Sequence, residues 1–148
     1  MPNTRATSRA TVPSRSSERE LCALALAARN NAHAPYSKFS VGAALRTSSG
    51  RVFTGCNVEN ASFGLTICAE RNAVAAAVAA GEREFKAIAI ATDLREPASP
   101  CGACRQVLAE FAPELRVLLT NPEGRIMRLK LSTLLPRRFD PSQVQRRR

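Results

Sequence analysis

Three cysteines constrain the fold of this chain more than any other feature. Cys101 and Cys104 form a C-x-x-C pair, whereas Cys68 lies far upstream of them. Residues at i and i+3 lie on one side of a helix, so the pair could reach a single ion from a first helical turn. Tetrahedral zinc takes four ligands, each sulfur about 2.3 Å from the ion. A metal site at the pair therefore requires a fold that carries Cys68 to the same place.

The number of thiols indicates an open site. A structural zinc site is closed by a fourth Cys or His, whereas a catalytic site keeps one position open. Cys22 falls in an apolar helical run and Cys56 in a strand-like segment, so neither has the spacing of a fourth ligand. We favour a catalytic zinc site; a closed zinc staple or plain buried thiols is the alternative.

Two charged residues follow the first of these cysteines. Glu70 comes two positions after Cys68, where its carboxylate would lie beside the metal and transfer protons without binding it. Three thiolates around Zn²⁺ leave one net negative charge, which opposes the activation of water. Arg71 and the N-termini of two helices starting near Cys68 and Cys101 would compensate for this charge. A solvated surface arginine is the alternative reading of Arg71.

The sequence around these residues resembles the small homotetrameric cytidine deaminases, including the Cys₃ form of the zinc deaminase signature. The matching blocks follow one another in order: residues 35–44 (PYSKFSVGAA), 55–62 (GCNVENAS), 67–71 (ICAER), 99–107 (SPCGACRQV) and 134–136 (LLP). The resemblance implies Zn²⁺ held by Cys68, Cys101 and Cys104, with Glu70 as the catalytic proton-transfer group. The implied reaction is hydrolytic deamination of cytidine and 2′-deoxycytidine, with release of ammonia, in pyrimidine salvage.

The resemblance also implies contacts to a small-molecule nucleoside. Asn57 and Glu59 match a pair that hydrogen-bonds the ribose 3′-hydroxyl, which both nucleosides carry, and a site built around a hydroxyl rejects analogues without it. Phe39 matches an aromatic residue that packs edge-on against the pyrimidine. Phe139 and the backbone of Ala61 would serve a neighbouring subunit's site, which implies a homotetramer with shared active sites. Polar residues in local turns and aromatic residues in the core are the alternatives.

Two further positions bear on the substrate. Glu59 argues against a blasticidin S deaminase activity for this chain, because that relative lacks the glutamate at this place in the motif. Phe63 departs from the tyrosine of many relatives, and one lost hydroxyl contact would cost about 1 kcal/mol of affinity at the sugar end.

Helical and strand patterns alternate along the chain. We expect helices over 17–33, 68–80 and 102–111 and strands over 41–47, 51–57, 87–92, 115–120 and 125–129. This is an α/β chain, and with the resemblance it indicates a three-layer α/β/α fold with a mixed five-stranded sheet. The turn at 121–124 is too short for a parallel crossover, so the last two strands should be antiparallel. His33, at an expected helix end, is more typical of a cation near a helix C-terminus than of a ligand.

The hairpin around residues 121–124 also bears on the substrate. In the family such a hairpin is typical of free-nucleoside deaminases, whereas deaminases that act on polynucleotides have a helical crossover at this point.

We expect a disordered basic leader at 1–16, a catalytic domain at 17–139 and a basic tail at 140–148. Much of the net charge of +10 lies in these ends, which argues against a continuous nucleic-acid track. A zinc protein that binds nucleic acid through its basic tails is the competing class.

Localisation follows from the cysteines and from hydropathy. Five cysteines, an odd number, suit a reducing compartment better than a disulfide framework. No apolar run reaches the length of about 18 residues that a membrane span needs. The sequence therefore predicts a cytoplasmic protein with no membrane partner and no specific nucleic-acid partner.

Overall fold

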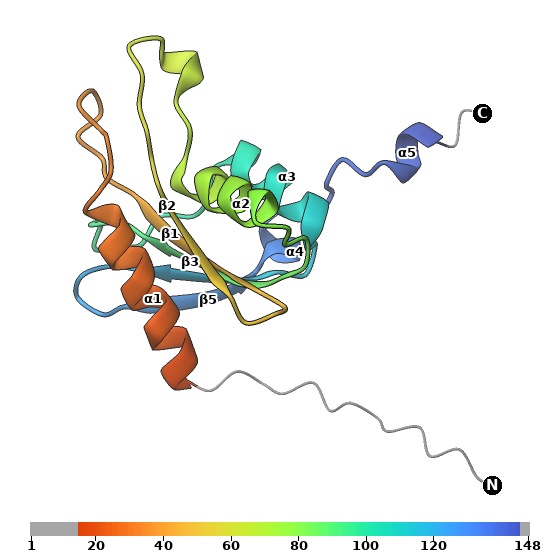
Figure 1. The fold of residues 1–148 in the computed structure, drawn as a ribbon, viewed down its shortest axis with the longest axis horizontal. Coiled ribbons are helices and arrows are strands. Elements are labelled where there is room, and N and C mark those ends of the chain that lie inside the picture. The colour runs from red at the N-terminus through yellow and green to blue at the C-terminus, as the bar shows by residue number, and fades with distance from the viewer. Residues whose placement is uncertain (1–14, 146–148) are drawn as a thin grey trace, which may run out of the picture.

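A mixed five-stranded sheet forms the centre of the computed structural model, which describes residues 15–145 (Figure 1). The strands are β1 (Gly42–Thr47), β2 (Val52–Cys56), β3 (Phe85–Ala91), β4 (Arg116–Thr120) and β5 (Ile126–Lys130). Their order across the sheet is β2-β1-β3-β4-β5. The β3–β4 pair is parallel and the other three pairs are antiparallel.

Helices cover both faces of this sheet, so the fold has three layers (Figure 1). The helical elements are α1 (Arg15–Arg29), η1 (Phe63–Leu65), α2 (Ala69–Ala79), α3 (Gly102–Phe111), α4 (Leu131–Leu134) and α5 (Ser142–Gln145). α1 packs on one face, and α2 and α3 pack on the other. The predicted three-layer α/β/α fold is confirmed, and so is the antiparallel pairing of the last two strands.

Successive side chains of β1 point to opposite faces of the sheet and so contribute to two separate hydrophobic cores. Ala43 and Leu45 face α2 and α3, whereas Ala44 faces α1. The α1 side is lined mainly by alanines of β1 and β3, which let the helix lie close to the sheet. At Gly42 the approach is closest: a Cβ there would lie 2.0 Å from the Ala25 carbonyl oxygen. Only glycine fits this contact.

The ends of α1 differ from the expected helix over residues 17–33. It begins at Arg15 and ends at Arg29. The prediction of His33 at a helix end is therefore wrong, because its N–H donates to the Asn57 carbonyl at 3.0 Å and its carbonyl accepts from Glu59. These two backbone hydrogen bonds pair His33 with the segment after β2, so residue 33 is extended and not helical. Residues 1–14 of the expected leader and 146–148 of the expected tail lie outside the described residues.

A membrane span was not expected from the sequence. Among residues 15–145, no helix combines the length and the apolar character needed to cross a bilayer. All five cysteines are free thiols.

Candidate active site

The three predicted zinc ligands come together at the N-termini of two helices. Cys68 is the N-cap of α2 and Cys101 the N-cap of α3, and Cys104 follows in the first turn of α3. Their sulfur atoms all lie within 4.8 Å of one another. The Cys104 N–H also donates to Cys101 Sγ at 3.4 Å. One backbone N–H group and the positive ends of two helix dipoles therefore lie beside the sulfurs, where they favour negative charge.

The spacing of the sulfurs fits a zinc ion. Cys68 Sγ and Cys101 Sγ lie 3.8 Å apart. Two sulfurs that each lie about 2.3 Å from zinc at a tetrahedral angle are separated by about 3.8 Å. Within residues 15–145 these three cysteines are the one group of metal-ligand side chains found together, so the protein offers three ligands and leaves a fourth position open. Cys22, buried on the face of α1 that packs on the sheet, and Cys56, at the end of β2, are not part of this group.

Arg71 supplies positive charge at the cluster. Its Nη2 donates to Cys68 Sγ at 3.7 Å and to the Thr66 carbonyl at 3.3 Å. A hydrogen bond with Cys104, aided by Arg71, lowers the pKa of Cys68 to about 5. The hydrogen bond with Cys68 raises the pKa of Cys104, as does burial. Cys68, Cys101 and Cys104 would hold zinc as thiolates, because the thiolate is the form of cysteine that binds metals.

Glu70 lies in the second position of α2, next to the cluster. Only 4% of its surface is exposed, and burial raises the pKa of its carboxyl group. A raised pKa brings a carboxyl group closer to the pH at which it can both accept and release a proton. Glu70 lines the same cavity as Cys68 and Cys101.

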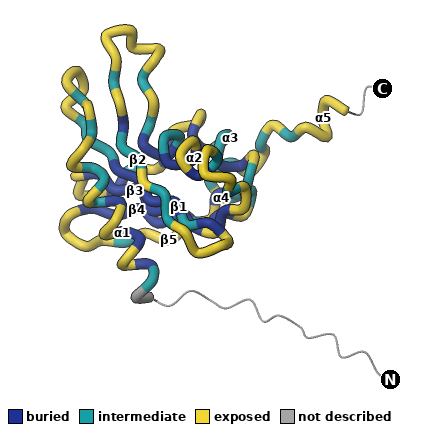
Figure 2. The backbone as a smooth tube through the Cα atoms, viewed as in Figure 1, coloured by how far each residue is buried: buried dark blue, intermediate teal, exposed yellow. Residues whose placement is uncertain are grey.

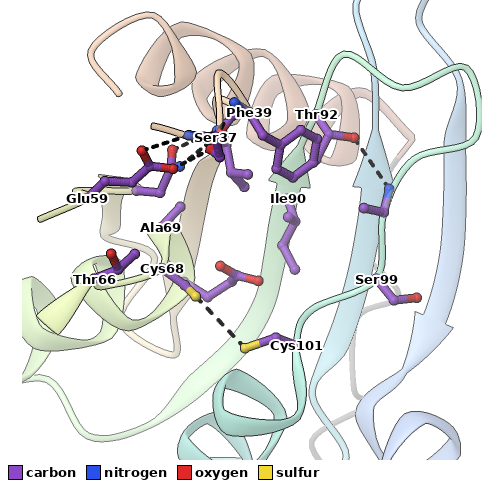
Figure 3. Close-up of a pocket in the computed structure, with 14 residues that line it drawn as sticks. Ser37, Phe39, Glu59, Thr66, Cys68, Ala69, Ile90, Thr92, Ser99 and Cys101 are labelled. Carbon is purple, nitrogen blue, oxygen red and sulfur yellow. Dashed lines mark hydrogen bonds between the residues drawn. The ribbon is translucent and has the colours of Figure 1, made fainter. Parts of the chain in front are cut away.

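This cavity has a volume of about 190 Å³ and extends from the sulfurs to the sugar-binding residues predicted from the sequence (Figure 3). Its far wall is formed by Ser37, Phe39, Asn57 and Glu59. Figure 3 shows Cys68 and Cys101 at one end and Glu59, Ser37 and Phe39 at the other. The structure therefore brings four predicted residue types into one hollow: thiol ligands, a buried acid, an aromatic ring and a polar pair.

Asn57 and Glu59 hold the loop before β1 as well as lining the cavity. The buried Asn57 donates from Nδ2 to the Phe39 carbonyl, and its Oδ1 accepts from the Val41 N–H, both at 2.8 Å. Glu59 Oε2 accepts from the N–H groups of Tyr36 at 2.9 Å and Ser37 at 3.2 Å. One Nδ2 proton of Asn57 stays available to a ligand, since an amide nitrogen carries two.

The remaining predicted site residues lie at the surface. Ala61 and Phe63 belong to the exposed segment 58–67 between β2 and α2, which projects beyond the sheet (Figure 2). Phe63 is 72% exposed and stacks edge-on against Tyr36. Phe139 is 64% exposed, and its backbone exchanges two hydrogen bonds with the Gln106 side chain. Neither Ala61 nor Phe139 lines the cavity of its own chain.

Several residues at the site received no role from the sequence. The Ser37 hydroxyl donates to Glu59 Oε1. Arg105 donates to the carbonyls of Pro100 at 2.8 Å and Leu134 at 2.7 Å, which ties the loop before α3 to the C-terminal part of the chain. Ser37 and Arg105 fall in blocks that match the family, but their partners lie 22 and 29 positions away, and no local pattern indicates such pairs.

Comparisons with known proteins agree with this geometry. Residues 15–120 match the family described as the cytidine and deoxycytidylate deaminase zinc-binding region. A cytidine deaminase of Halalkalibacterium halodurans is 50% identical over 116 residues, which cover 78% of this chain and 88% of the relative.

Two solved structures share the fold. The cytidine deaminase of Burkholderia pseudomallei has 51% identity and a TM-score of 0.80, and the match covers 86% of this chain and all of that one, 100%. The enzyme of Mycobacterium tuberculosis has 41% identity and a TM-score of 0.73, over 83% of this chain and 97% of that one. The matched family region contains the whole thiol cluster, the buried Glu70 and the polar pair. This chain belongs to the cytidine deaminase family and is a zinc-dependent enzyme.

Proposed function

We propose that the protein catalyses the hydrolytic deamination of cytidine and 2′-deoxycytidine to uridine and 2′-deoxyuridine, with release of ammonia. The observation that carries this proposal is the placement of a buried acid, Glu70, beside three clustered thiols in a cavity that Asn57 and Glu59, the predicted sugar-binding pair, also line. In this proposal each of these groups contacts one part of a cytosine nucleoside. Pyrimidine salvage in the cytoplasm is the role in which we place this reaction.

The chain's own residues perform the proton transfers. Zinc, when bound, supplies a Lewis acid that makes water nucleophilic at neutral pH. Glu70 accepts the two protons of the attacking water in turn. It delivers the first to N3 of the pyrimidine as the water oxygen bonds to C4, and the second to the amino group, which leaves as ammonia when the C4–N bond breaks. Its burial excludes bulk water from these transfers. Such general acid–base catalysis is typically worth about 10²–10⁴-fold in rate.

The sugar end of the substrate would contact Asn57 and Glu59. A carboxylate only accepts hydrogen bonds, so a ribose 3′-hydroxyl would donate to Glu59 and accept from the free Nδ2 proton of Asn57. Phe39, on the loop that both residues hold, would pack against the base. Ribosides and 2′-deoxyribosides both present the 3′-hydroxyl, which is why we propose that both are substrates.

We also propose a homotetramer in which neighbouring subunits complete each active site. The support is a cluster of exposed apolar side chains on segment 58–67: Val58, Phe63, Leu65 and Ile67 are 43%, 72%, 65% and 41% exposed. Large exposed apolar patches are typical of protein interfaces. Ala61 lies on the same segment, and Phe139 lies exposed after α4, so both are available to a neighbour's cavity in the proposed tetramer.

An absorbance assay tests the reaction. Zinc-replete protein is added to cytidine, cytosine, CMP or a short cytosine-containing single strand, and loss of cytosine absorbance is followed. We expect rapid loss with cytidine and no loss with cytosine or the strand. Turnover of the strand would favour a polynucleotide deaminase, and salt-dependent binding of the strand without turnover would favour the competing nucleic-acid-binding class.

Glu70→Gln provides the residue test. The variant should lose at least about 10²-fold in kcat while it retains zinc, because glutamine keeps the size of the side chain but cannot exchange the proton. Zinc content is measured in parallel. Glu110→Gln, the same change at an exposed position of α3, serves as the control and should turn over normally. Near-normal activity of Glu70→Gln would exclude Glu70 as the proton-transfer group.

A further inference from the structure

Ser37 links the two predicted substrate-binding residues through one hydroxyl group. Its Oγ–H donates to Glu59 Oε1, and its Oγ accepts from the Phe39 N–H at 3.0 Å. A hydroxyl has one proton and two lone pairs, so both bonds can form at once. The residue that would bind the sugar and the residue that would pack on the base are therefore both held by Ser37 (Figure 3).

The hydrogen bonds at Glu59 leave one defined position for a ligand. A carboxylate has four acceptor sites, two on each oxygen. The N–H groups of Tyr36 and Ser37 occupy both sites on Oε2, and the Ser37 hydroxyl occupies one of the two sites on Oε1. A ribose hydroxyl must then donate to the second site on Oε1. The orientation of Oε1 depends on the Ser37 hydroxyl, which is the one hydrogen-bond donor to Oε1 among residues 15–145.

The charge of Glu59 and the backbone of the loop depend on the same bonds. Chiefly through the Ser37 hydroxyl, the pKa of the Glu59 carboxyl group is held below its usual value, so the group stays a pure acceptor. Lys38, between Ser37 and Phe39, has a φ of +59°, a left-handed conformation that is unfavourable for a lysine. The bond from the Phe39 N–H to Ser37 Oγ spans this residue and holds the turn that places the Phe39 ring in the cavity.

We propose that Ser37 is a positioning residue that sets the enzyme's preference for substrates with a 3′-hydroxyl. It acts through Glu59, whose free Oε1 site it orients, and it places Phe39 by the same hydroxyl. The inference deepens the proposed function and rests on Glu59 as the acceptor of the sugar hydroxyl.

The test compares cytidine with 3′-deoxycytidine, which lacks the hydroxyl in question. In Ser37→Ala, KM for cytidine should rise about tenfold, the usual effect of losing a hydrogen bond to a charged group, with kcat changed much less. KM for 3′-deoxycytidine should rise less, because this substrate loses only the contribution of the Phe39 ring, so the preference for cytidine falls. Ser37→Thr keeps the hydroxyl and should restore it. Ser40→Ala removes a hydroxyl from the same loop and is the matched control. Within the described residues, Ser40 takes part in a hydrogen bond through its backbone carbonyl and not through its hydroxyl.

A second background tests whether Ser37 acts through Glu59. The double variant Glu59→Gln, Ser37→Ala should show the same preference for cytidine over 3′-deoxycytidine as Glu59→Gln alone. The reason is that the oxygen that Ser37 orients no longer carries a charge in Glu59→Gln. Additive losses would overturn the inference. Calorimetric titration with uridine and 3′-deoxyuridine gives the same comparison without turnover, and zinc content is checked in each variant.

The outcomes separate this inference from the proposed function. A wild-type protein that does not deaminate cytidine overturns both. A wild-type protein that deaminates cytidine and 3′-deoxycytidine equally well overturns the role of Glu59, and the inference with it, but leaves the deamination intact. A folded, zinc-replete Ser37→Ala that keeps the wild-type preference overturns the inference alone. If Ser37→Ala does not fold, loss of the preference in a folded Ser37→Thr would overturn it.

Discussion

Arg71 shows how much of the site depends on a single side chain. Three thiolates and one Zn²⁺ carry a net negative charge, and Arg71 Nη2 lies 3.7 Å from Cys68 Sγ. Arg71 Nε is buried and has no hydrogen-bond partner among residues 15–145. Burying an unsatisfied donor costs folding free energy. That cost is tolerable where the same guanidinium stabilises an anionic cluster.

Arg71→Gln should therefore weaken zinc binding by about 10–100-fold, the range typical of partners that support metal ligands. Competition of the purified protein with a chromogenic chelator measures the affinity. Arg83→Gln is the control, because Arg83 lies after the C-terminal end of α2, is exposed and, within the described residues, donates only to backbone carbonyls. An Arg71 variant that retains zinc as firmly as this control would argue for a purely structural arginine.

At the scale of elements, the contact between β2 and α2 determines where two site residues lie. Cys68 caps α2 and Glu70 occupies its second position, so both move with the helix. Gly55 in β2 lets the helix approach: a Cβ there would lie 2.4 Å from the Ala69 carbonyl oxygen and 2.6 Å from the Ala73 nitrogen. These are backbone atoms, which cannot turn aside as a side chain would.

Gly55→Ala is expected to push α2 away from the sheet. It should destabilise the protein by about 3 kcal/mol or more, the upper range for overpacking, and should reduce zinc retention as well. Denaturant unfolding and metal analysis measure the two effects. Thr54→Ala, at an exposed neighbour on the same strand, should cost about 1 kcal/mol or less and keep the metal. Equal stability of the two variants would contradict the tight seating of α2.

At the scale of the whole molecule, segment 58–67 carries apolar surface that one chain leaves open to solvent (Figure 2). Phe63→Glu combined with Leu65→Glu should dissociate the proposed tetramer, because charged side chains are costly to bury in an interface. Sedimentation velocity measures the assembly and circular dichroism the fold. Met127→Glu, a charge added at a partly exposed apolar side chain of β5, is the control. Activity should fall along with assembly if Phe139 and Ala61 serve neighbouring sites.

The helices and strands were largely predictable because their patterns are local. Apolar periodicity placed the five strands and three main helices within a few residues, and the short turn before Arg125 required antiparallel pairing of β4 and β5. The end of α1 was not predictable in this way. A backbone bridge between His33 and residues 57–59 ends the helical path early, and no local pattern encodes that bridge.

The sequence by itself determined which residue types meet at the centre of the site. A C-x-x-C pair, a distant cysteine and the Glu70 that follows it have few uses other than an open zinc site with an acid beside it. Only the tertiary structure decided how Asn57, Glu59 and Ser37 hold the loop that carries Phe39. Those bonds join residues about 20 positions apart in the chain. Their donors and acceptors are common polar groups, so composition and spacing carry no signal of the pairing, whereas a fold that packs two loops together selects one arrangement of bonds that satisfies them.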